Sequence, residues 1–189
     1  MSLVLASSSP RRRAILEALG LRFRVVPSTA EEIGTEGERP DATAQRLARD
    51  KAREVASREA GFVLGADTVV VVDGEVLGKP EDPVDAARML RLLGGRWHEV
   101  ITGVAVVRGE LEDAMCVTTR VRFCELSEAR ISRYVATGEG VDKAGAYAVQ
   151  AVGAGLVTRV EGSYSNVVGL PAAETIDLLE RAGAIEVWP

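Results

Sequence analysis

The stretch Phe62-Val-Leu-Gly-Ala-Asp-Thr-Val-Val-Val-Val-Asp-Gly74 contains two apolar, β-branched runs, 62–66 and 69–72, on either side of Asp67-Thr68. Runs of this kind are typical of strands buried in a core. The dipeptide Asp73-Gly74 that follows is a hairpin turn signal. The stretch therefore predicts core strands with one carboxylate, that of Asp67, at the edge of the core.

The N-terminal residues predict a strand, a serine loop and a helix. Residues 3–6 form a short apolar run, Ser7-Ser8-Ser9-Pro10 follows, and residues 11–19 carry apolar side chains at helical spacing. Ser9 suits the N-cap, and Pro10 suits the first helical position, where its missing N–H costs nothing. Gly20 fits the end of the helix.

The rest of the chain alternates strand and helix signals. Further strands are expected at 23–27, 97–107, 111–123 and 156–161, and helices at 42–60, 83–93, 127–137 and 171–182. Residues 97–107 and 111–123 predict a long hairpin, whereas the helices between other strands predict crossovers, so the sheet should be mixed. Without repeats, low-complexity tracts or linkers, residues 1–189 are interpreted as one compact α/β domain.

Charge and the apolar pattern exclude two classes of partner. The net charge is −5, from 23 Lys+Arg and 28 Asp+Glu, whereas duplex-binding domains usually carry a basic excess. The apolar run at the N-terminus is far too short for a signal peptide or a membrane span. We therefore expect neither a nucleic-acid nor a membrane partner.

Cysteine and histidine usage bears on location and metal chemistry. Cys116 and Cys124 lie in one extended segment and should be about 26 Å apart, too far for a disulfide. This fits a reducing compartment, so a cytoplasmic location is expected. With only one histidine, His98, a Cys/His zinc site is excluded, and any metal must bind oxygen ligands.

The serine loop is the first candidate site. Its hydroxyls and the N–H groups at the following helix N-terminus can bind an anion. Arg11, Arg12 and Arg13 lie in the first helical turn, where the helix dipole disfavours cations unless an anionic ligand is near. A solvated basic turn with an ordinary serine cap explains the same residues.

Two charged residues interrupt apolar patterns. Lys51 lies within the apolar stripe of the 42–60 helix, where it must either pair or snorkel to the margin. Asp67 must meet a cation, a metal or hydrogen-bond donors, because an unpartnered buried charge is costly. The alternative for Asp67 is a structural Asx-turn.

Lys79 and Gln150 are weaker candidates. Lys79 stands between Gly78, which permits close approach of a ligand, and Pro80, which favours extended geometry. A plain surface turn gives the same pattern. Gln150 ends a small, weakly polar run and could read a flat hydrogen-bonding edge, while His98 is interpreted as structural.

Motifs along the whole chain, in order, resemble the Maf family. They are Ser8-Ser9-Pro10-Arg11-Arg12, Leu47-Ala48-Arg49-Asp50-Lys51-Ala52, Gly65-Ala66-Asp67-Thr68-Val69-Val70, Gly78-Lys79-Pro80, Asp142-Lys143-Ala144-Gly145-Ala146-Tyr147 with Gln150, Gly162-Ser163-Tyr164 and Val168-Gly169-Leu170-Pro171. The resemblance implies an inosine-triphosphatase-like fold, in which an elongated, twisted mixed sheet with flanking helices forms two lobes around a central cleft. It also implies a nucleoside triphosphate pyrophosphatase that uses Mg²⁺ or Mn²⁺ and forms a homodimer.

The resemblance also implies roles for individual residues. Asp67 matches the family's proton acceptor, and Glu32 matches an acidic position, although Ala30-Glu31-Glu32 departs from the family's usual Val-Asp-Glu. The positions that handle the phosphates are matched by Ser9, Arg12, Lys51 and Lys79. Asp67 and Glu32 can both hold the metal through oxygen and deprotonate water, and the sequence leaves open which carboxylate does which.

Base specificity follows from three further positions. At these positions the chain resembles the branch that hydrolyses dTTP and UTP, because it carries Arg11, Thr68 and Gln150. A branch acting on 7-methyl-GTP carries Trp, Gln and Glu there. The sequence therefore predicts hydrolysis of dTTP and UTP to the monophosphate and pyrophosphate. The alternatives are a non-catalytic nucleotide-binding regulator of septation, and a pyrophosphatase for non-standard purine nucleotides or 7-methyl-GTP.

Overall fold

The computed structural model describes residues 2–35 and 37–189. The chain forms two compact units. Unit 1 comprises the residues up to Asp67 with Thr102–Val117 and Gly169–Pro189, and unit 2 comprises Thr68–Ile101 and Thr118–Val168. That residues 1–189 act as one family domain stays a prediction.

The sheet of unit 1 begins with three parallel strands. β1 (Leu3–Leu5) pairs in parallel with β2 (Phe23–Val25) on one side and with β3 (Phe62–Val72) on the other. β5 (Trp97–Arg108) and β6 (Leu111–Phe123) continue the order beyond β3. The parallel strands are connected by α1 (Pro10–Ala18) and α2 (Pro40–Ala56), as parallel pairs require crossovers.

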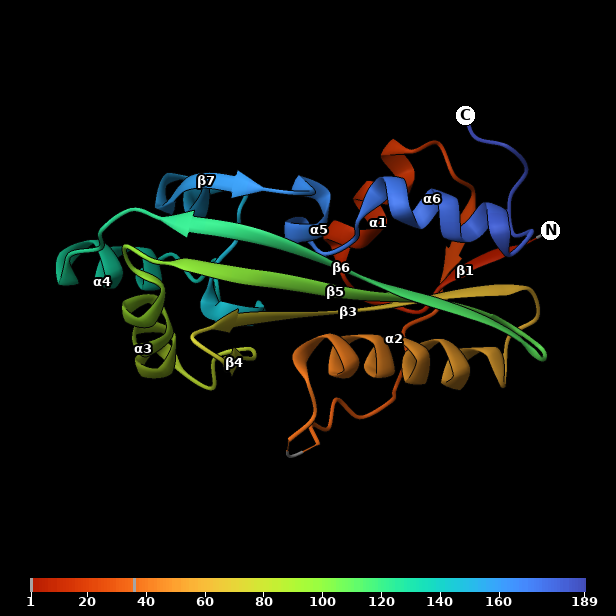
Figure 1. The fold of residues 1–189 in the computed structure, drawn as a ribbon, viewed down its shortest axis with the longest axis horizontal. Coiled ribbons are helices and arrows are strands. Elements are labelled where there is room, and N and C mark those ends of the chain that lie inside the picture. The colour runs from red at the N-terminus through yellow and green to blue at the C-terminus, as the bar shows by residue number, and fades with distance from the viewer. Residues whose placement is uncertain (1, 36) are drawn as a thin grey trace. The chain divides into compact units, whose positions relative to one another are not determined.

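Both faces of the unit 1 sheet are buried under helices. Figure 1 shows α2 on one face and α1 with α6 (Ala172–Arg181) on the other. Alternate residues of the strands supply the two cores: Leu3, Leu5 and Leu64 pack toward Leu16, Leu178 and Leu179, whereas Val4 and Val63 pack toward Ala48, Ala52 and Val55. Burial on both sides explains why β1 and β3 are continuously apolar.

Unit 2 adds antiparallel pairs to the same long strands. β4 (Glu75–Leu77) pairs with β3, and β7 (Val157–Glu161) pairs with β6. Its helices are α3 (Pro83–Leu93), α4 (Glu128–Ala136) and α5 (Tyr164–Val168), and two 3-10 segments, η1 (Ala144–Ala146) and η2 (Ala151–Leu156), lie between α4 and β7. The mixed α/β class with flanking helices is therefore confirmed, whereas the cleft between lobes stays a prediction.

A cluster of three rings forms part of the unit 2 core. His98, Phe123 and Tyr147 meet edge to face with centroids 4.7 to 5.4 Å apart, a favourable aromatic geometry. The Tyr147 hydroxyl lies 2.8 Å from Nε2 of His98. Burial lowers the pKa of His98 to about 4, so the ring is neutral at physiological pH. This agrees with the interpretation of His98 as structural.

Several element boundaries match the sequence prediction. The helix over 83–93 is confirmed, Ser9 and Ser127 are N-caps, and Asp73-Gly74 turns β3 into β4. Cys116 and Cys124 are free thiols. The helix predicted over 42–60 is wrong at both ends: Pro40 begins it, since proline is tolerated in a first turn, and Ser57 caps its end.

Asp67 and Thr68 do not interrupt the strand. The two apolar runs predicted on either side of them belong to one strand of 11 residues, β3. The reason is that the Asp67 carboxylate has a cationic partner, described below, so it does not need a turn conformation. Among the described residues, no helix is both long and apolar enough to cross a membrane.

Candidate active site

A buried ion-pair cluster lies on β3 and α2 in unit 1. Nζ of Lys51 donates to Oδ1 of Asp67 at 2.5 Å and to Oε1 of Glu32 at 2.7 Å. Lys51 and Asp67 are 8% and 7% exposed, whereas the Glu32 side chain is 44% exposed. Lys51 is therefore paired rather than snorkelling, and the Asx-turn alternative for Asp67 is wrong. The cluster carries two carboxylates and one ammonium, so its formal charge is −1.

Close packing of α2 on the sheet places Lys51 at this point. A Cβ added to Gly65 would lie 2.2 Å from the carbonyl oxygen of Ala48, and one added to Gly103 would lie 2.2 Å from that of Ala44. Any side chain at these two glycines would push the helix away from β3 and β5. The glycine two residues before Asp67 thus lets the helix carrying Lys51 approach the strand.

Arg46 binds two of the residues that follow Glu32 in sequence. Its guanidinium donates to both carboxylate oxygens of Glu38 at 2.8 to 3.2 Å and to the carbonyl of Ile33 at 2.9 Å. The hydrogen bond from Arg46 lowers the pKa of Glu38, which keeps that carboxylate ionised. Arg46 therefore positions the residue next to Glu32 from the same helix that supplies Lys51.

The serine loop holds Arg12 in a defined position. The N-cap Ser9 accepts from the Arg12 backbone N–H at 3.4 Å. Nε of Arg12 donates to the carbonyl of Gly169 at 2.9 Å, and Nη1 donates to Oγ of Ser7 at 3.2 Å. Burial lowers the pKa of Arg12, while the charges of Asp67 and Glu32 act in the opposite direction. An arginine stays protonated regardless, so Arg12 adds a second cation beside the cluster.

Ser7 is a positioning residue that the sequence did not single out. It is 8% exposed and accepts from both the Arg12 guanidinium and the Ser9 backbone N–H, the latter at 3.2 Å. Only its place at the end of a buried strand distinguishes it in sequence from Ser8, which is exposed. Ser7 thus links the N-cap to the arginine.

Replacing Ser7 with alanine should destabilise unit 1 measurably. Ser7→Ala leaves two donors without their acceptor, so we expect a loss of about 1–3 kcal/mol in the free energy of unfolding, measured by urea denaturation. Ser8→Ala is the matched control and should change it by less than about 0.5 kcal/mol. Equal values for the two variants would contradict the bonding of Arg12 through Ser7.

Three of the predicted site residues belong to unit 2. Thr68 is half-buried and follows Asp67 in β3, while Lys79 and Gln150 are exposed. The Gly145 N–H donates to the carbonyl of Gly78 at 3.0 Å, which ties the Lys79 turn to the segment before Gln150. That these residues act together with those of unit 1 stays a prediction.

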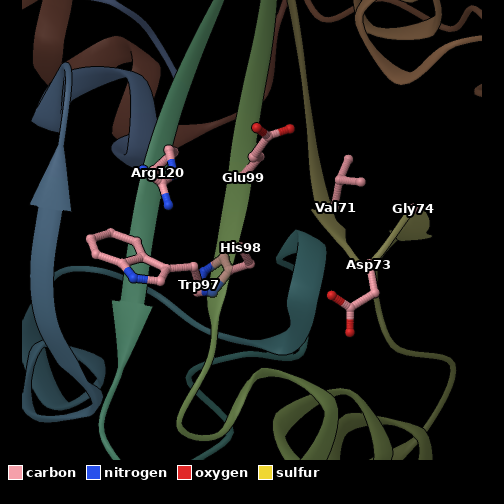
Figure 2. A pocket seen from close by; sticks show the side chains of 7 residues that line it. All are labelled: Val71, Asp73, Gly74, Trp97, His98, Glu99 and Arg120. Carbon is pink, nitrogen blue, oxygen red and sulfur yellow. The ribbon is translucent and has the colours of Figure 1, made fainter.

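A pocket within unit 2 contains none of the predicted site residues. It has a volume of about 190 Å³ and is lined by Val71, Asp73, Gly74, Trp97, His98, Glu99 and Arg120. Figure 2 shows the carboxylates of Asp73 and Glu99 among the side chains that line it. The guanidinium of Arg120 stacks over the Trp97 ring at 4.5 Å. Asp73 pairs with Arg96, and Arg120 pairs with Glu161, so neighbouring side chains already engage these charges. The pocket therefore does not replace the cluster as the candidate site.

The cluster offers carboxylate oxygens to a cation. Asp67 and Glu32 bind the same ammonium nitrogen, so both side chains point to one place where positive charge is stabilised. Within residues 2–35 and 37–189, no group of three or more His, Cys, Asp or Glu side chains is arranged to hold a metal ion. A metal here would have two protein carboxylates, with other ligands from water or substrate, as is common for Mg²⁺.

Two solved structures resemble the chain distantly. The Ham1 protein of Staphylococcus aureus gives a TM-score of 0.49 at 14% identity, over 65% of this chain and 72% of that one. A nucleoside-triphosphatase / dITP/XTP pyrophosphatase from Mycobacterium abscessus gives 0.43 at 18% identity, over 65% and 73%.

Sequence relatives are much closer. A dTTP/UTP pyrophosphatase of Anaeromyxobacter sp. (strain Fw109-5) is 54% identical over 98% of this chain and 92% of its own length. One from Koribacter versatilis (strain Ellin345) is 50% identical over 98% and 96%. The family model for Maf-like proteins matches residues 2–182. With its motifs in order from the serine loop to Pro171, this chain belongs to the Maf family.

Proposed function

We propose that this chain is a nucleoside triphosphate pyrophosphatase that hydrolyses dTTP and UTP to the monophosphate and pyrophosphate. The observation that carries the proposal is the buried cluster in which Lys51 pairs with Asp67 and Glu32. The names of the relatives in Anaeromyxobacter and Koribacter support the choice of substrates. A binding protein without catalysis would need the cations but not two carboxylates at the same place.

The residues divide into those that act on water and those that neutralise phosphate. Water attacks the α-phosphorus, the P–O bond to the α–β bridging oxygen breaks, and pyrophosphate leaves. Asp67 accepts the proton of that water at its carboxylate. Arg12, Lys51 and Lys79 neutralise the phosphate oxygens, and the N–H groups at the start of α1, behind Ser9, add donors.

Asp67 and Glu32 would hold a divalent metal, Mg²⁺ or Mn²⁺. When bound, such a cation offsets charge on the phosphate oxygens and lowers the pKa of a coordinated water. The Lys51 ammonium contacts both carboxylates, so it holds the two side chains together. Its flexible four-carbon stem would let the same ammonium turn toward a phosphate oxygen.

Base selection is assigned to Arg11, Thr68 and Gln150. The Gln150 amide offers one donor and one acceptor, which suit the O4/N3 edge of thymine or uracil. Arg11 adds donors to a pyrimidine carbonyl and would repel the positive charge of 7-methylguanine. Thr68 suits a small base sterically. A site built to hydrogen-bond one edge rejects another, because its polar groups are left unpaired.

The assembly and location belong to the same proposal. A homodimer follows from the family resemblance. A cytoplasmic location is supported by the two free thiols, Cys116 and Cys124, which suit a reducing compartment.

The test is a screen of purified protein against all common and modified nucleoside triphosphates, with pyrophosphate and phosphate scored separately. We expect pyrophosphate release with dTTP and UTP as the preferred substrates. Release of single phosphates would exclude cleavage at the α–β anhydride. Preference for ITP or 7-methyl-GTP would move the chain to the alternative substrate classes, and no turnover of any nucleotide would favour a binding protein.

Removing divalent metal should abolish the activity. After exhaustive chelation we expect pyrophosphate release from dTTP to fall by at least about a hundredfold, because charge on the phosphate oxygens is no longer offset. Addition of Mg²⁺ or Mn²⁺ should restore the activity. Addition of Ca²⁺ shows how the activity with a larger ion compares. Full activity in the chelated protein would contradict the metal role of Asp67 and Glu32.

A further inference from the structure

We propose that Glu139 and Tyr134 are positioning residues for base discrimination, because their side chains fix the backbone on both sides of Gln150. This inference deepens the proposed function and rests on it. Every residue involved lies in unit 2.

Hydrogen bonds to backbone amides carry the argument. Oε1 of Glu139 accepts from the N–H of Val152 at 3.0 Å, and Oε2 accepts from that of Gly153 at 2.7 Å. The hydroxyl of Tyr134 donates to Oε2 of Glu139 at 2.7 Å and accepts from the N–H of Ala148 at 3.1 Å. Two side chains therefore bind the amides two residues before Gln150 and two and three residues after it. Bonds to a carboxylate are about twice as strong as neutral ones.

The segment needs such support because its backbone is costly. Ala146 and Ala151 have φ of +59° and +50°, a region that residues with a Cβ rarely adopt. The segment also folds tightly on itself, since a Cβ on Gly153 would lie 2.0 Å from the carbonyl oxygen of Ala148. Conformations of this kind persist only where surrounding contacts determine them.

The segment presents Gln150 rather than burying it. Tyr147, Ala148 and Val149 are buried, while Gln150 is exposed. Tyr134 is itself 4% exposed, and burial next to the Glu139 carboxylate raises its pKa, so the hydroxyl keeps its proton. Recognition of a base edge favours a fixed backbone with one solvent-facing side-chain amide, that of Gln150. On a mobile loop the same amide would lose conformational entropy when the base binds.

The experiment compares UTP with CTP, which differ at the pyrimidine edge assigned to Gln150. In Glu139→Gln, an NH₂ group replaces one acceptor oxygen and faces a donor, so at least one bond to the segment is lost. We expect the ratio of kcat/KM for UTP over CTP to fall by about tenfold, the factor for one hydrogen bond. Tyr134→Phe should lower the same ratio. Glu128→Gln, at the start of α4 where the exposed carboxylate pairs with Arg91, is the matched control and should keep it.

Amide hydrogen exchange supplies a readout independent of turnover. Val152 and Gly153 should lose protection in Glu139→Gln and keep it in Glu128→Gln. A folded Glu139→Gln protein with the wild-type UTP/CTP ratio, or with unchanged protection at both amides, would overturn the inference. If the wild-type protein hydrolyses neither dTTP nor UTP, the proposed function fails instead, and amide exchange still decides whether Glu139 orders the segment.

Discussion

Asp67→Asn should abolish pyrophosphate release while the protein stays folded. The asparagine keeps the shape of the side chain and an oxygen that can accept from Lys51, but it cannot take a proton from water. General-base catalysis contributes about 10²- to 10⁴-fold, so kcat for dTTP should fall by at least about a hundredfold. Steady-state kinetics with a pyrophosphate assay measures it.

The structure explains why the fold should tolerate this change. Lys51 also pairs with Glu32 at 2.7 Å, so its buried charge retains an anionic partner in the variant. The matched control is Asp73→Asn at the far end of the same β3 hairpin, where the carboxylate pairs with Arg96 in an exposed position. Asp73→Asn should keep near wild-type turnover. A folded Asp67→Asn protein with near wild-type kcat would remove Asp67 from the mechanism.

Local chemistry made much of the fold predictable. Ser9 and Pro10 mark the start of α1, and Ser127 marks that of α4, because caps are decided by neighbouring residues. The end of α2 and the continuity of β3 were not predictable in the same way. The strand runs through Asp67 only because Lys51, 16 residues earlier in sequence, neutralises it. Tertiary pairing of this kind overrides local preference and leaves no local signal.

The candidate site likewise contains residues that the sequence pattern revealed and residues that only tertiary contacts reveal. Asp67 and Lys51 stood out because charges within apolar patterns need partners, and the structure pairs them with each other. Glu139 gave no such signal, because a glutamate between two glycines looks like an ordinary surface residue, and nothing in the sequence set Ser7 apart from the other hydroxyls of the serine loop. Their importance comes from which backbone or side-chain donors the fold brings to them, Arg12 in one case and Gly153 in the other.

Lys51→Met should have a larger effect on stability than any other single change at the site. It removes the ammonium that contacts both Asp67, 7% exposed, and Glu32, so the Asp67 carboxylate loses its ion-paired partner and only the charge of Arg12 nearby offsets the two carboxylates. Removing one partner of a buried pair costs about 3–5 kcal/mol. For a protein of this size that corresponds to a fall in Tm of roughly 6–20 °C, measured by calorimetry.

A second substitution separates the charge effect from a packing effect. In Lys51→Met/Asp67→Asn neither buried charge remains, and replacing both partners is far less costly than removing one, so most of the lost stability should return. Turnover should stay absent in both proteins, because phosphate neutralisation and the base are gone. Lys79→Met is the control for a lysine assigned to phosphate but exposed: it should lower turnover and change the free energy of unfolding by less than about 1 kcal/mol. Two results would contradict this account: Lys51→Met no less stable than Lys79→Met, or the double variant no more stable than Lys51→Met. Either result would mean that the pairing of Lys51 with Asp67 does not stabilise the fold and that the cation at this position acts on the substrate alone.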